Sequence, residues 1–408
     1  MRFSTVLTLL PLAVASPVAQ RSEPAPLITR STVEPHNADR YIVKFKEGSA
    51  MSIVQDALQH VSVEATHHFQ HIFQGFAAKL DSKSVELLRL LPDVSCISQP
   101  TICETTTNKV TRSSTLSRTA PVLLLDTSPR APLPGVSPVS LTVKRAAAAT
   151  YDSSGGQGVC AYVTDSGVDD SHPEFEGRAH QIKSFIQGSN RDDLGHGTHC
   201  AGTISSKTYG VAKKTEPYGV KVLKATDSFQ YSDLIAAWDF ITQDAPNRNC
   251  PNGVVISVSL GGGYSQSLNN AANNMIDKGY FMAIAAGNDN DNTANHSPGS
   301  ASKVCTVGGS DSSDRRYSDS NYGPAVDIVG PAVSVLSTLP GGRTAYYTGT
   351  SMATPHIAGL AAYIASRDGV RASPSLCGTI ANTASKGAIT NQSANTVNLI
   401  AFNGNPSG

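Results

Sequence analysis

The segment DDLGHGTHCAGT, residues 192 to 203, brings His196, His199 and Cys200 within five positions of one another. Imidazole and thiol groups at this spacing can bind zinc, can pair a thiol nucleophile with its base, or can supply one catalytic base beside two packing residues. Zinc would need a fourth ligand or a water, and the chain has no other closely spaced Cys and His pair. The third interpretation requires a nucleophile and a carboxylate elsewhere.

Three other segments carry the groups that a serine hydrolase needs. Asp165 follows the apolar run CAYVT, Ser351 lies at a Gly-Thr turn before a helix rich in small residues, and Asn288 follows AAG. Serine chemistry combines a hydroxyl nucleophile, an imidazole base, a carboxylate that orients the base, and donors for the oxyanion. Each residue alone is more typical of a turn, a cap or a packing position. Only their combination indicates hydrolysis.

The elements that position these groups alternate from Tyr151 onward, which predicts an α/β domain with a mainly parallel sheet covered on both faces. The predicted strands are VCAYVTD, GVKVLKA, GVVISVSLGG, YFMAIAAGN, KVCTVGG and AVDIVGP. The predicted helices are THCAGTISS, YSDLIAAWDFITQ, LNNAANNMIDKG and SMATPHIAGLAAYIASR. Functional groups gather at the carboxyl ends of such strands. Pro355 lies early enough in the last helix to be tolerated there.

The chain before this domain divides into three parts. Residues 1–15 combine Arg2 with a short apolar run and small residues, as in a secretory signal, and the run is too short to span a membrane. Residues 40–102 alternate strand and helix patterns in a unit of marginal size, which predicts a small α+β domain that needs a partner surface. Residues 105–150 are rich in Thr, Ser and Pro and predict a linker. We therefore expect an exported, extracellular protein.

The charge balance excludes two classes of partner. Lys plus Arg and Asp plus Glu each number 32, so no excess of positive charge favours nucleic acid or an anionic membrane. The 39% hydrophobic content is sufficient for a sizeable core. We expect neither nucleic acid nor membrane as a partner.

The motifs GHGTHCAGT and GTSMATPHIAG, with DSG upstream, resemble the subtilase family of serine peptidases, in particular its proteinase K-like fungal branch. The resemblance covers nearly all of residues 151–402, while RYIVKF and GFAAKL resemble the inhibitor-type propeptide of the same family. It implies a signal peptide at 1–15, a propeptide at 16–104 and a peptidase domain at 151–408 with a subtilisin-like three-layer fold. It also implies a secreted endopeptidase that is made as an autoprocessed zymogen, with its own propeptide as intramolecular inhibitor.

The resemblance assigns roles to individual positions. Asp165, His196 and Ser351 would be the orienting acid, the general base and the nucleophile, and Asn288 would donate to the oxyanion. The implied substrate-binding residues are Leu194, Tyr231, Ser259, Leu260, Gly261, Ala285 and Gly287. Leu194 stands where relatives usually carry Asn, and Phe229 replaces a small glycine. We expect broad specificity with a preference for bulky apolar or aromatic residues at the cut.

The family pattern further implies disulfides Cys160–Cys250 and Cys305–Cys377, with Cys200 left as a free thiol one helical turn behind His196. It implies a structural calcium ion held by Ser302, Val304 and Asp327, no cofactor for catalysis, and a monomer that acts on proteins and peptides.

Residues 105–150 lack the Trp-Gly-Leu motif that begins mature relatives. They are either a divergent N-terminus or the result of a frame or splice error in the coding sequence. Two rival functions follow from the residues: a zinc or thiol enzyme built on the 196–200 cluster, and a binding or inhibitory protein on an inactive scaffold. Asn391 heads a sequon for glycosylation in secretion.

Overall fold

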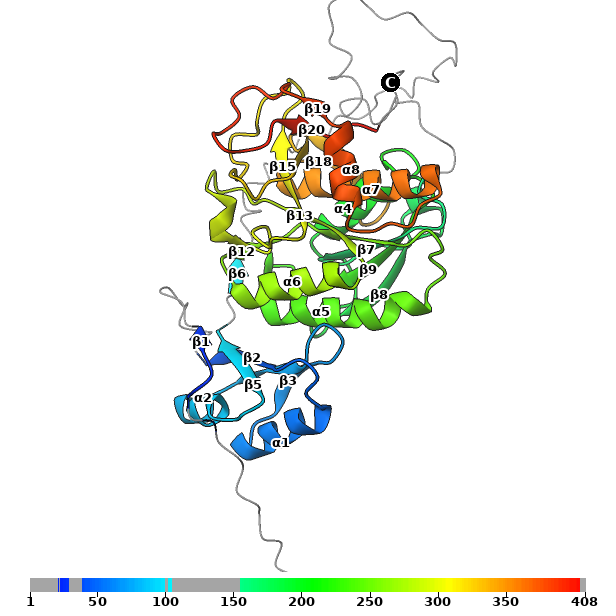
Figure 1. The fold of residues 1–408 in the computed structure, drawn as a ribbon. Helices are drawn as coiled ribbons and strands as arrows, with labels where there is room; N and C mark the ends of the chain where they lie inside the picture. Colours follow the sequence, from blue (N-terminus) through cyan, green and yellow to red (C-terminus); the bar gives the residue numbers. More distant parts are fainter. Residues whose placement is uncertain (1–20, 22, 29–38, 100–101, 105–154, 404–408) are drawn as a thin grey trace, which may run out of the picture.

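The computed structural model describes residue 21 and residues 23–28, 39–99, 102–104 and 155–403 (Figure 1). The signal segment and the 105–150 segment predicted from the sequence lie outside the described residues. The N-terminal unit is a five-stranded sheet in the order β1-β5-β2-β4-β3 with two helices. Its elements are β1 Leu27–Ile28, β2 Arg40–Phe45, α1 Met51–Val61, β3 Ala65–Phe69, β4 Gly75–Lys79, α2 Ser82–Arg89 and β5 Val94–Ser98.

Alternation along β2 sends the side chains of this small sheet to two different cores. Val43 and Phe45 pack with α1 and α2 in the unit's own core, whereas Ile42 beside Val43 belongs to a core shared with the larger domain. In a strand, successive side chains point to opposite faces. The unit therefore buries its second face against the larger domain, which is the partner surface that its size predicted.

The larger domain contains a nine-stranded sheet in the order β19-β20-β16-β15-β13-β11-β7-β9-β8. All neighbours pair in parallel except β19 and β20, which are antiparallel. The strands are β7 Cys160–Asp165, β8 His180–Ser184, β9 Glu216–Lys221, β11 Val254–Val258, β13 Phe281–Ala285, β15 Cys305–Ser310, β16 Ile328–Pro331, β19 Ser385–Lys386 and β20 Leu399–Ile400.

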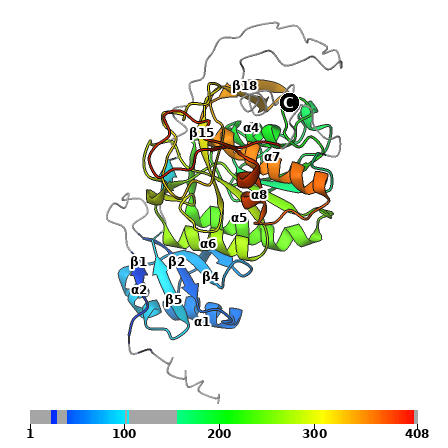
Figure 2. The same cartoon turned by 45° about the horizontal axis from the view of Figure 1, so that its top comes forward.

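Helices cover both faces of this sheet, as the sequence predicted (Figures 1 and 2). They are α4 His196–Ser205, α5 Tyr231–Asp244, α6 Gln266–Asp277, α7 Thr350–Asp368 and α8 Leu376–Thr383. Ile256 of β11 packs in the core with α5 and α6, while its neighbour Val255 packs in the core with α4 and α7. The N-terminal unit lies against α5 and α6, so the layer of α4 and α7 remains on the other side of the sheet.

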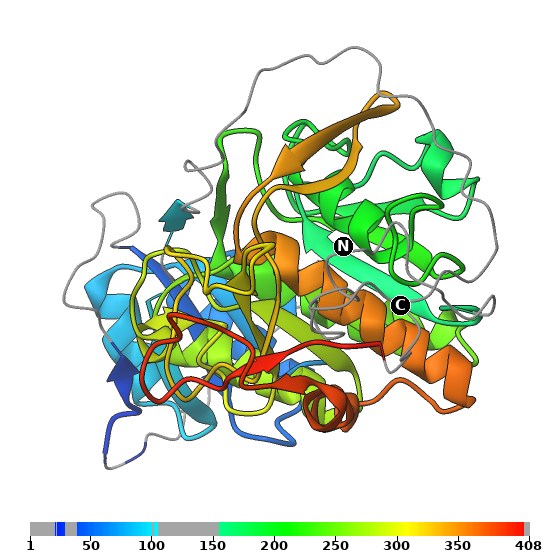
Figure 3. The same cartoon turned by 90° about the horizontal axis from the view of Figure 1, so that it is seen from above.

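Short pairs of strands complete the domain. β10 Ser228–Gln230 pairs with β6 Ile102–Glu104, and β12 Gly262–Gly263 pairs with β14 His296–Ser297. The hairpin of β17 Val335–Leu339 and β18 Arg343–Tyr347, which the sequence patterns did not predict, contacts α4 (Figure 3). Among the described residues, no helix has the length and apolar character needed to cross a bilayer.

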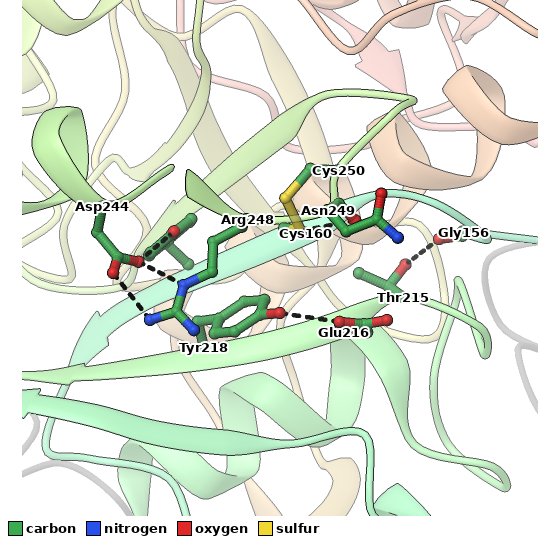
Figure 4. The surroundings of a disulfide bond; sticks show 10 residues. Gly156, Cys160, Thr215, Glu216, Tyr218, Asp244, Arg248, Asn249 and Cys250 are labelled. Atoms are coloured by element: carbon green, nitrogen blue, oxygen red, sulfur yellow. Dashed lines mark hydrogen bonds and ion pairs between the residues drawn. A yellow bond between two sulfur atoms is a disulfide. The ribbon is translucent and has the colours of Figure 1, made fainter. Parts of the chain in front are cut away.

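Two disulfides join distant parts of the larger domain. Cys160 at the start of β7 is bonded to Cys250, 90 residues along the chain (Figure 4). Cys305 at the start of β15 is bonded to Cys377 in α8. Beside the first, the Arg248 guanidinium lies 4.9 Å from the Tyr218 ring centroid. The Cys160–Cys250 bond closes a loop with a sequence separation of 90 residues. In the account based on chain entropy, closing such a loop raises the free energy of the unfolded state by roughly 4 to 5 kcal/mol.

Candidate active site

His196 is the first residue of α4, and the loop before it is shaped by one buried carboxylate. Asp192 accepts hydrogen bonds from the backbone N–H groups of Gly195 at 2.7 Å and Thr198 at 2.9 Å, and from the Thr198 hydroxyl. Gly195 has φ +92, a conformation that other residues adopt only with strain. Asp192 is not among the residues predicted from the sequence, although an Asp a few residues before a helix is a familiar capping signal.

Asp165 and His196 form the central pair. Asp165 ends β7 and is fully buried, and its Oδ1 lies 2.8 Å from His196 Nδ1 and accepts from Ser166 N–H at 2.7 Å. Since an ionised carboxylate only accepts, Nδ1 carries the imidazole proton and Nε2 keeps a free lone pair. His196 Nε2 has no hydrogen-bond partner in the part of the chain that the structure describes. The imidazole is therefore oriented as a base.

Two opposing effects set the pKa of His196. Burial is the largest single effect and lowers this pKa, but the charge of the Asp165 carboxylate, with smaller contributions from Cys200 and from the hydrogen bonds to both residues, raises it, and the net pKa lies well above its usual range. Cys200 lies near the same ring nitrogen as Asp165, with its Sγ 4.0 Å from His196 Nδ1. Burial raises the pKa of the Cys200 thiol, so this thiol stays protonated at neutral pH and Asp165 is the anion that favours the imidazolium. Stabilising the imidazolium is what a general base requires when it takes a proton.

Ser351 is the second residue of α7, and a missing hydrogen bond inside that helix positions it. Pro355 is the sixth residue, beyond the first turn expected for a tolerated proline, and has no N–H to donate to the Ser351 carbonyl one turn back. That carbonyl instead accepts from the Ser259 hydroxyl at 2.8 Å and from the Cys200 thiol at 3.5 Å. The proline thus frees the nucleophile's carbonyl to bind the end of β11.

The Ser351 hydroxyl faces the same neighbour. It donates to the Ser259 carbonyl at 3.0 Å, so the Ser351–His196 hydrogen bond of an active serine hydrolase is not made in this state. The Cys200 thiol contacts both the His196 imidazole and the Ser351 carbonyl, which brings the ends of α4 and α7 together. Rotation about one side-chain bond of Ser351 turns its hydroxyl away from Ser259.

Asn288 lies beside the start of α7. Its Oδ1 accepts from the Thr350 N–H at 2.8 Å and the Thr350 hydroxyl at 3.0 Å, which leaves the amide nitrogen as its donor end. A Cβ on Gly349 would lie 3.5 Å from that nitrogen. As second helical residue, Ser351 has no carbonyl one turn back within α7 to accept its N–H. Two donors therefore border the nucleophile.

Among the predicted substrate-binding residues, Tyr231 at the start of α5 connects to β12. The Tyr231 hydroxyl donates to the Gly263 carbonyl at 2.7 Å and its ring centroid lies 5.6 Å from that of Phe229, which is 1% exposed. Leu194 is partly buried against the same core. The remaining predicted residues are Ser259 and Leu260 directly after β11, Gly261 before β12, and Ala285 and Gly287 at the end of β13.

His199 does not join this site. Its Nε2 lies 3.1 Å from the carbonyl oxygens of Val335 and Ala345, and its ring stacks on Tyr347 with centroids 4.6 Å apart. Burial lowers the pKa of His199 to about 3, so it remains neutral. A zinc site of His196, His199 and Cys200 is therefore not assembled. Asp165, His196 and Cys200 do converge, but Asp165 and His196 share the imidazole proton.

Asp327, the acidic residue of the predicted calcium site, lies beside the Cys305–Cys377 disulfide. Its Oδ2 accepts from the Thr306 N–H at 2.8 Å, and the carboxylate lies within 4.8 Å of the Cys305 sulfur, next to Val304. Burial raises the pKa of Asp327 to about 6, against the opposing effect of the Thr306 N–H. Among the described residues, no Lys, Arg or His forms an ion pair with it. Calcium prefers oxygen ligands such as carboxylates and backbone carbonyls.

The N-terminal unit makes polar contacts with the larger domain at α5, at β10 and at α6, where the Asn274 amide donates to the Ile72 carbonyl at 3.0 Å. Asp239 of α5 is 7% exposed and accepts the backbone N–H groups of Gln70, His71 and Ile72, at 2.6 Å for His71 and 2.7 Å for Ile72. His67 Nε2 lies 2.8 Å from Asp233 Oδ1 in the first turn of α5. At the second contact, β6 adds an antiparallel strand to β10, with residue 103 opposite Phe229.

Comparison with known proteins agrees with this geometry. A model of the subtilase family matches residues 156–400, and a model of the peptidase inhibitor I9 family matches residues 40–106. Proteinase R of Parengyodontium album is 50% identical over 99% of both chains. The cuticle-degrading protease of Metarhizium anisopliae is 46% identical over 99% of this chain and 100% of its own. The solved structure of a cold adapted subtilisin-like serine proteinase matches with a TM-score of 0.57 and 37% identity, covering 61% of this chain and 90% of the other.

Proposed function

Because the chain belongs to the subtilase family of serine peptidases and carries an I9-type propeptide, we propose that Ser351, His196 and Asp165 are its catalytic residues. The observation that carries this assignment is the 2.8 Å contact between Asp165 and His196, which leaves His196 Nε2 without a hydrogen-bond partner among the described residues. Ser351 Oγ attacks the peptide carbonyl and its proton passes to His196 Nε2. His196 then protonates the leaving amine, and water releases the acyl-enzyme.

Asn288 and the Ser351 backbone N–H donate to the oxyanion in this proposal. Support comes from Thr350, which binds Asn288 Oδ1 and so fixes the amide with its nitrogen as donor. Loss of one such donor from a relative of this family costs about 2.7 to 4 kcal/mol of barrier. A serine-directed phosphonylating reagent tests the catalytic assignment. It should inactivate the enzyme and modify the peptide that contains Ser351, whereas modification of Cys200 with Ser351 unmodified would contradict it.

The chain is a zymogen-type peptidase, and we infer that its propeptide blocks the site by occupying the substrate edge. Support comes from β6, which pairs with β10 as an added strand and also contacts β12. Substrate peptides would bind in the same extended form once the propeptide is removed. We further propose that the signal segment at 1–15 directs export and that the mature enzyme is an extracellular monomer, with its N-terminus within or after residues 105–150.

We propose broad specificity with a preference for bulky apolar or aromatic residues at the cut. Support comes from Leu194, Phe229 and Tyr231, which pack in or against one apolar core, with Phe229 in β10 and the Tyr231 hydroxyl bonded to Gly263 of β12. The exposed backbone of Gly261 and Gly287 would form the rims of the primary pocket, together with Ser259, Leu260 and Ala285. A library of peptides varied at each position around the cut would measure this preference, and equal turnover of charged and aromatic residues would contradict it.

We propose a structural calcium ion held by the Asp327 carboxylate and the carbonyls of Ser302 and Val304. The raised pKa of Asp327 predicts at which pH the removal of calcium lowers Tm more. Without a cation, stability is lost as pH rises from the unfolded value of about 4 through the folded pKa of about 6, because the buried group must ionise. Bound calcium removes that loss, so a chelator should lower Tm by several degrees at pH 8 and by little at pH 5.

The matched control for this site is Asp327→Asn, which keeps the shape of the side chain and removes its charge. Its Tm should be insensitive to the chelator at both pH values. An equal effect of chelator at pH 5 and pH 8, or full sensitivity in Asp327→Asn, would contradict the assignment.

A further inference from the structure

A buried phenylalanine lies on the strand with which the propeptide pairs. Burial alternates along β10, because Phe229 is 1% exposed whereas Ser228 and Gln230 are only partly buried. Successive side chains of a strand point to opposite faces, so Phe229 points into the domain and its two neighbours point away from it. The Phe229 ring packs against Tyr231, with ring centroids 5.6 Å apart. The inner face of this strand is therefore aromatic.

Tyr231 joins the two strands that the propeptide strand contacts. β6 pairs with β10 and also contacts β12. Tyr231 directly follows β10 and is fully buried, and its hydroxyl donates to the Gly263 carbonyl of β12 at 2.7 Å. Leu260, before β12, is 3% exposed and belongs to the same apolar core as Phe229 and Tyr231. The interior beside β10 is therefore already filled by the side chains of the catalytic domain.

The strand register defines which peptide residue meets Phe229. In the antiparallel pair of β6 and β10, residue 103 is the partner of Phe229. Residues directly opposite in such a pair share one face, with Cβ atoms about 4.5 to 5.5 Å apart. A substrate residue that takes this place therefore directs its side chain toward the space that the Phe229 ring occupies. The propeptide has a small residue here, Cys103.

This substrate position differs from the residue at the cut. The carbonyl of Ser259 accepts from the Ser351 hydroxyl, and the two residues of β12, Gly262 and Gly263, follow Ser259 by three and four positions. An extended peptide along this segment advances by the same ~3.3 Å per residue. Since the propeptide precedes the cut, the residue opposite Phe229 lies about three or four positions before it. The bulky residue proposed at the cut itself therefore does not meet Phe229.

We propose that Phe229 limits the size of the substrate residue that pairs with it, so that this position accepts glycine, alanine, serine or cysteine and rejects aromatic and long aliphatic residues. The proposal rests on the peptidase function proposed above and on extended binding at β10. Protein interiors are close-packed, so a second large side chain beside the Phe229 ring would displace the peptide from strand pairing. Such a misfit should lower kcat/KM by roughly ten- to hundredfold.

The test is a series of peptide anilides hydrolysed by the processed enzyme. Each peptide has phenylalanine at the cut and carries alanine, leucine or phenylalanine at the third, fourth or fifth position before it. At one of these positions, the wild type should lose about ten- to hundredfold in kcat/KM from alanine to phenylalanine. Phe229→Ala opens the space and should reduce this loss to less than threefold, and Phe229→Leu should give an intermediate ratio.

A matched control separates this effect from a general loosening of the fold. Phe175 is fully buried in the other core of the domain, beside His172. Phe175→Leu removes the same atoms as Phe229→Leu but should keep the wild-type ratio between alanine and phenylalanine peptides. The Tm of each variant shows whether it folds, and Phe229→Leu provides the milder test if Phe229→Ala does not fold.

Self-processing of the full-length chain provides a second measurement. Cys103→Phe places a large side chain opposite Phe229 and should slow release of the propeptide at least tenfold, whereas Cys103→Ala should process like the wild type. Combining Cys103→Phe with Phe229→Ala should restore processing to within threefold of Phe229→Ala alone, because the ring and the new side chain compete for one space.

The outcomes distinguish this proposal from the one on which it rests. Absence of hydrolysis for every peptide, with Ser351 unreactive toward the phosphonylating reagent, would show that the peptidase assignment has failed. An active enzyme that hydrolyses alanine and phenylalanine peptides equally at all three positions would overturn the size limit. A size limit that persists unchanged in both Phe229→Ala and Phe229→Leu would overturn the role of Phe229.

Discussion

Two of the contacts between the propeptide and the catalytic domain, those at α5 and at β10, use different chemistry. At α5, the buried Asp239 carboxylate accepts hydrogen bonds from three successive backbone N–H groups of the propeptide, and Asp233 binds His67. At β10, the segment Ile102–Glu104 makes strand pairing through backbone atoms. Carboxylates fixed on a helix recognise one loop shape, whereas a strand edge accepts any extended chain.

We propose that this difference lets one protein bind its inhibitor tightly and its substrates broadly. In this proposal, selectivity for the propeptide resides at Asp233 and Asp239 of α5. The β10 edge can then remain permissive, with selectivity supplied by side chains that flank it. Changes at Asp233 and Asp239 should therefore alter inhibition without altering hydrolysis, and changes around β10 should do the reverse.

The largest effect is expected from Ser351→Ala, which should stop self-processing while both contacts persist. Loss of the nucleophile in a subtilase lowers kcat by roughly 10⁶-fold. The secreted product should retain its propeptide on a denaturing gel and show no casein hydrolysis. Normal processing of this variant in a host that lacks other proteases would contradict the assignment of Ser351.

The second-largest effect is expected in inhibition by the propeptide, from Asp239→Asn. This substitution keeps the shape of the side chain and removes its charge. Hydrogen bonds to a charged acceptor are worth about 1.5 to 3 kcal/mol each, so a net loss of about 2 to 3 kcal/mol should weaken inhibition by added propeptide roughly 30- to 150-fold. Peptide hydrolysis by the processed enzyme should be unchanged.

Asp277→Asn is the matched control, since Asp277 lies on the neighbouring helix α6 and pairs only with exposed Lys303. Its inhibition constant should equal that of the wild type. If Asp239→Asn and Asp277→Asn are inhibited equally, the α5 contact is not the source of selectivity.

A smaller effect is expected from Leu194→Asn, and it should appear in hydrolysis instead of in inhibition by the propeptide. Removing an apolar wall should cost about 1 to 1.5 kcal/mol for substrates with an apolar residue second before the cut, or roughly five- to tenfold in kcat/KM. Substrates with a polar residue there should be hydrolysed as before. A uniform decrease across both classes would indicate a displaced His196 instead of an altered pocket.

The smallest effect is expected from His67→Ala in the propeptide. The partly buried contact with Asp233 should contribute about 0.5 to 1 kcal/mol, so inhibition should weaken two- to fivefold. Exposed His68 is adjacent in the sequence, and His68→Ala should inhibit like the wild-type propeptide. A larger effect for His68→Ala than for His67→Ala would show that the ion pair does not contribute.

Much of the fold could be predicted because its signals are local. The apolar period of YSDLIAAWDFITQ predicts α5, and VCAYVTD predicts β7 with Asp165 at its end. The contacts of Asp239 with the propeptide loop and of Ser259 with Ser351 could not be predicted, because each partner lies on a distant segment. Asp239 lies in an ordinary amphipathic helix, and nothing in its own neighbourhood indicates the propeptide loop. The sequence indicates only that Pro355 is tolerated, whereas its effect is exerted on Ser351 one turn back.

The bond between Cys160 and Cys250 determines what happens to the protease when another copy of it cleaves a surface turn. The span that it closes contains Asp165, His196 and β10, and the surface turns between them are natural cutting points. A single cut inside the span leaves the fragments covalently joined and the packed sheet in place. Chains with one cleaved peptide bond should therefore accumulate with their fold intact, and their fragments should separate only under reducing conditions.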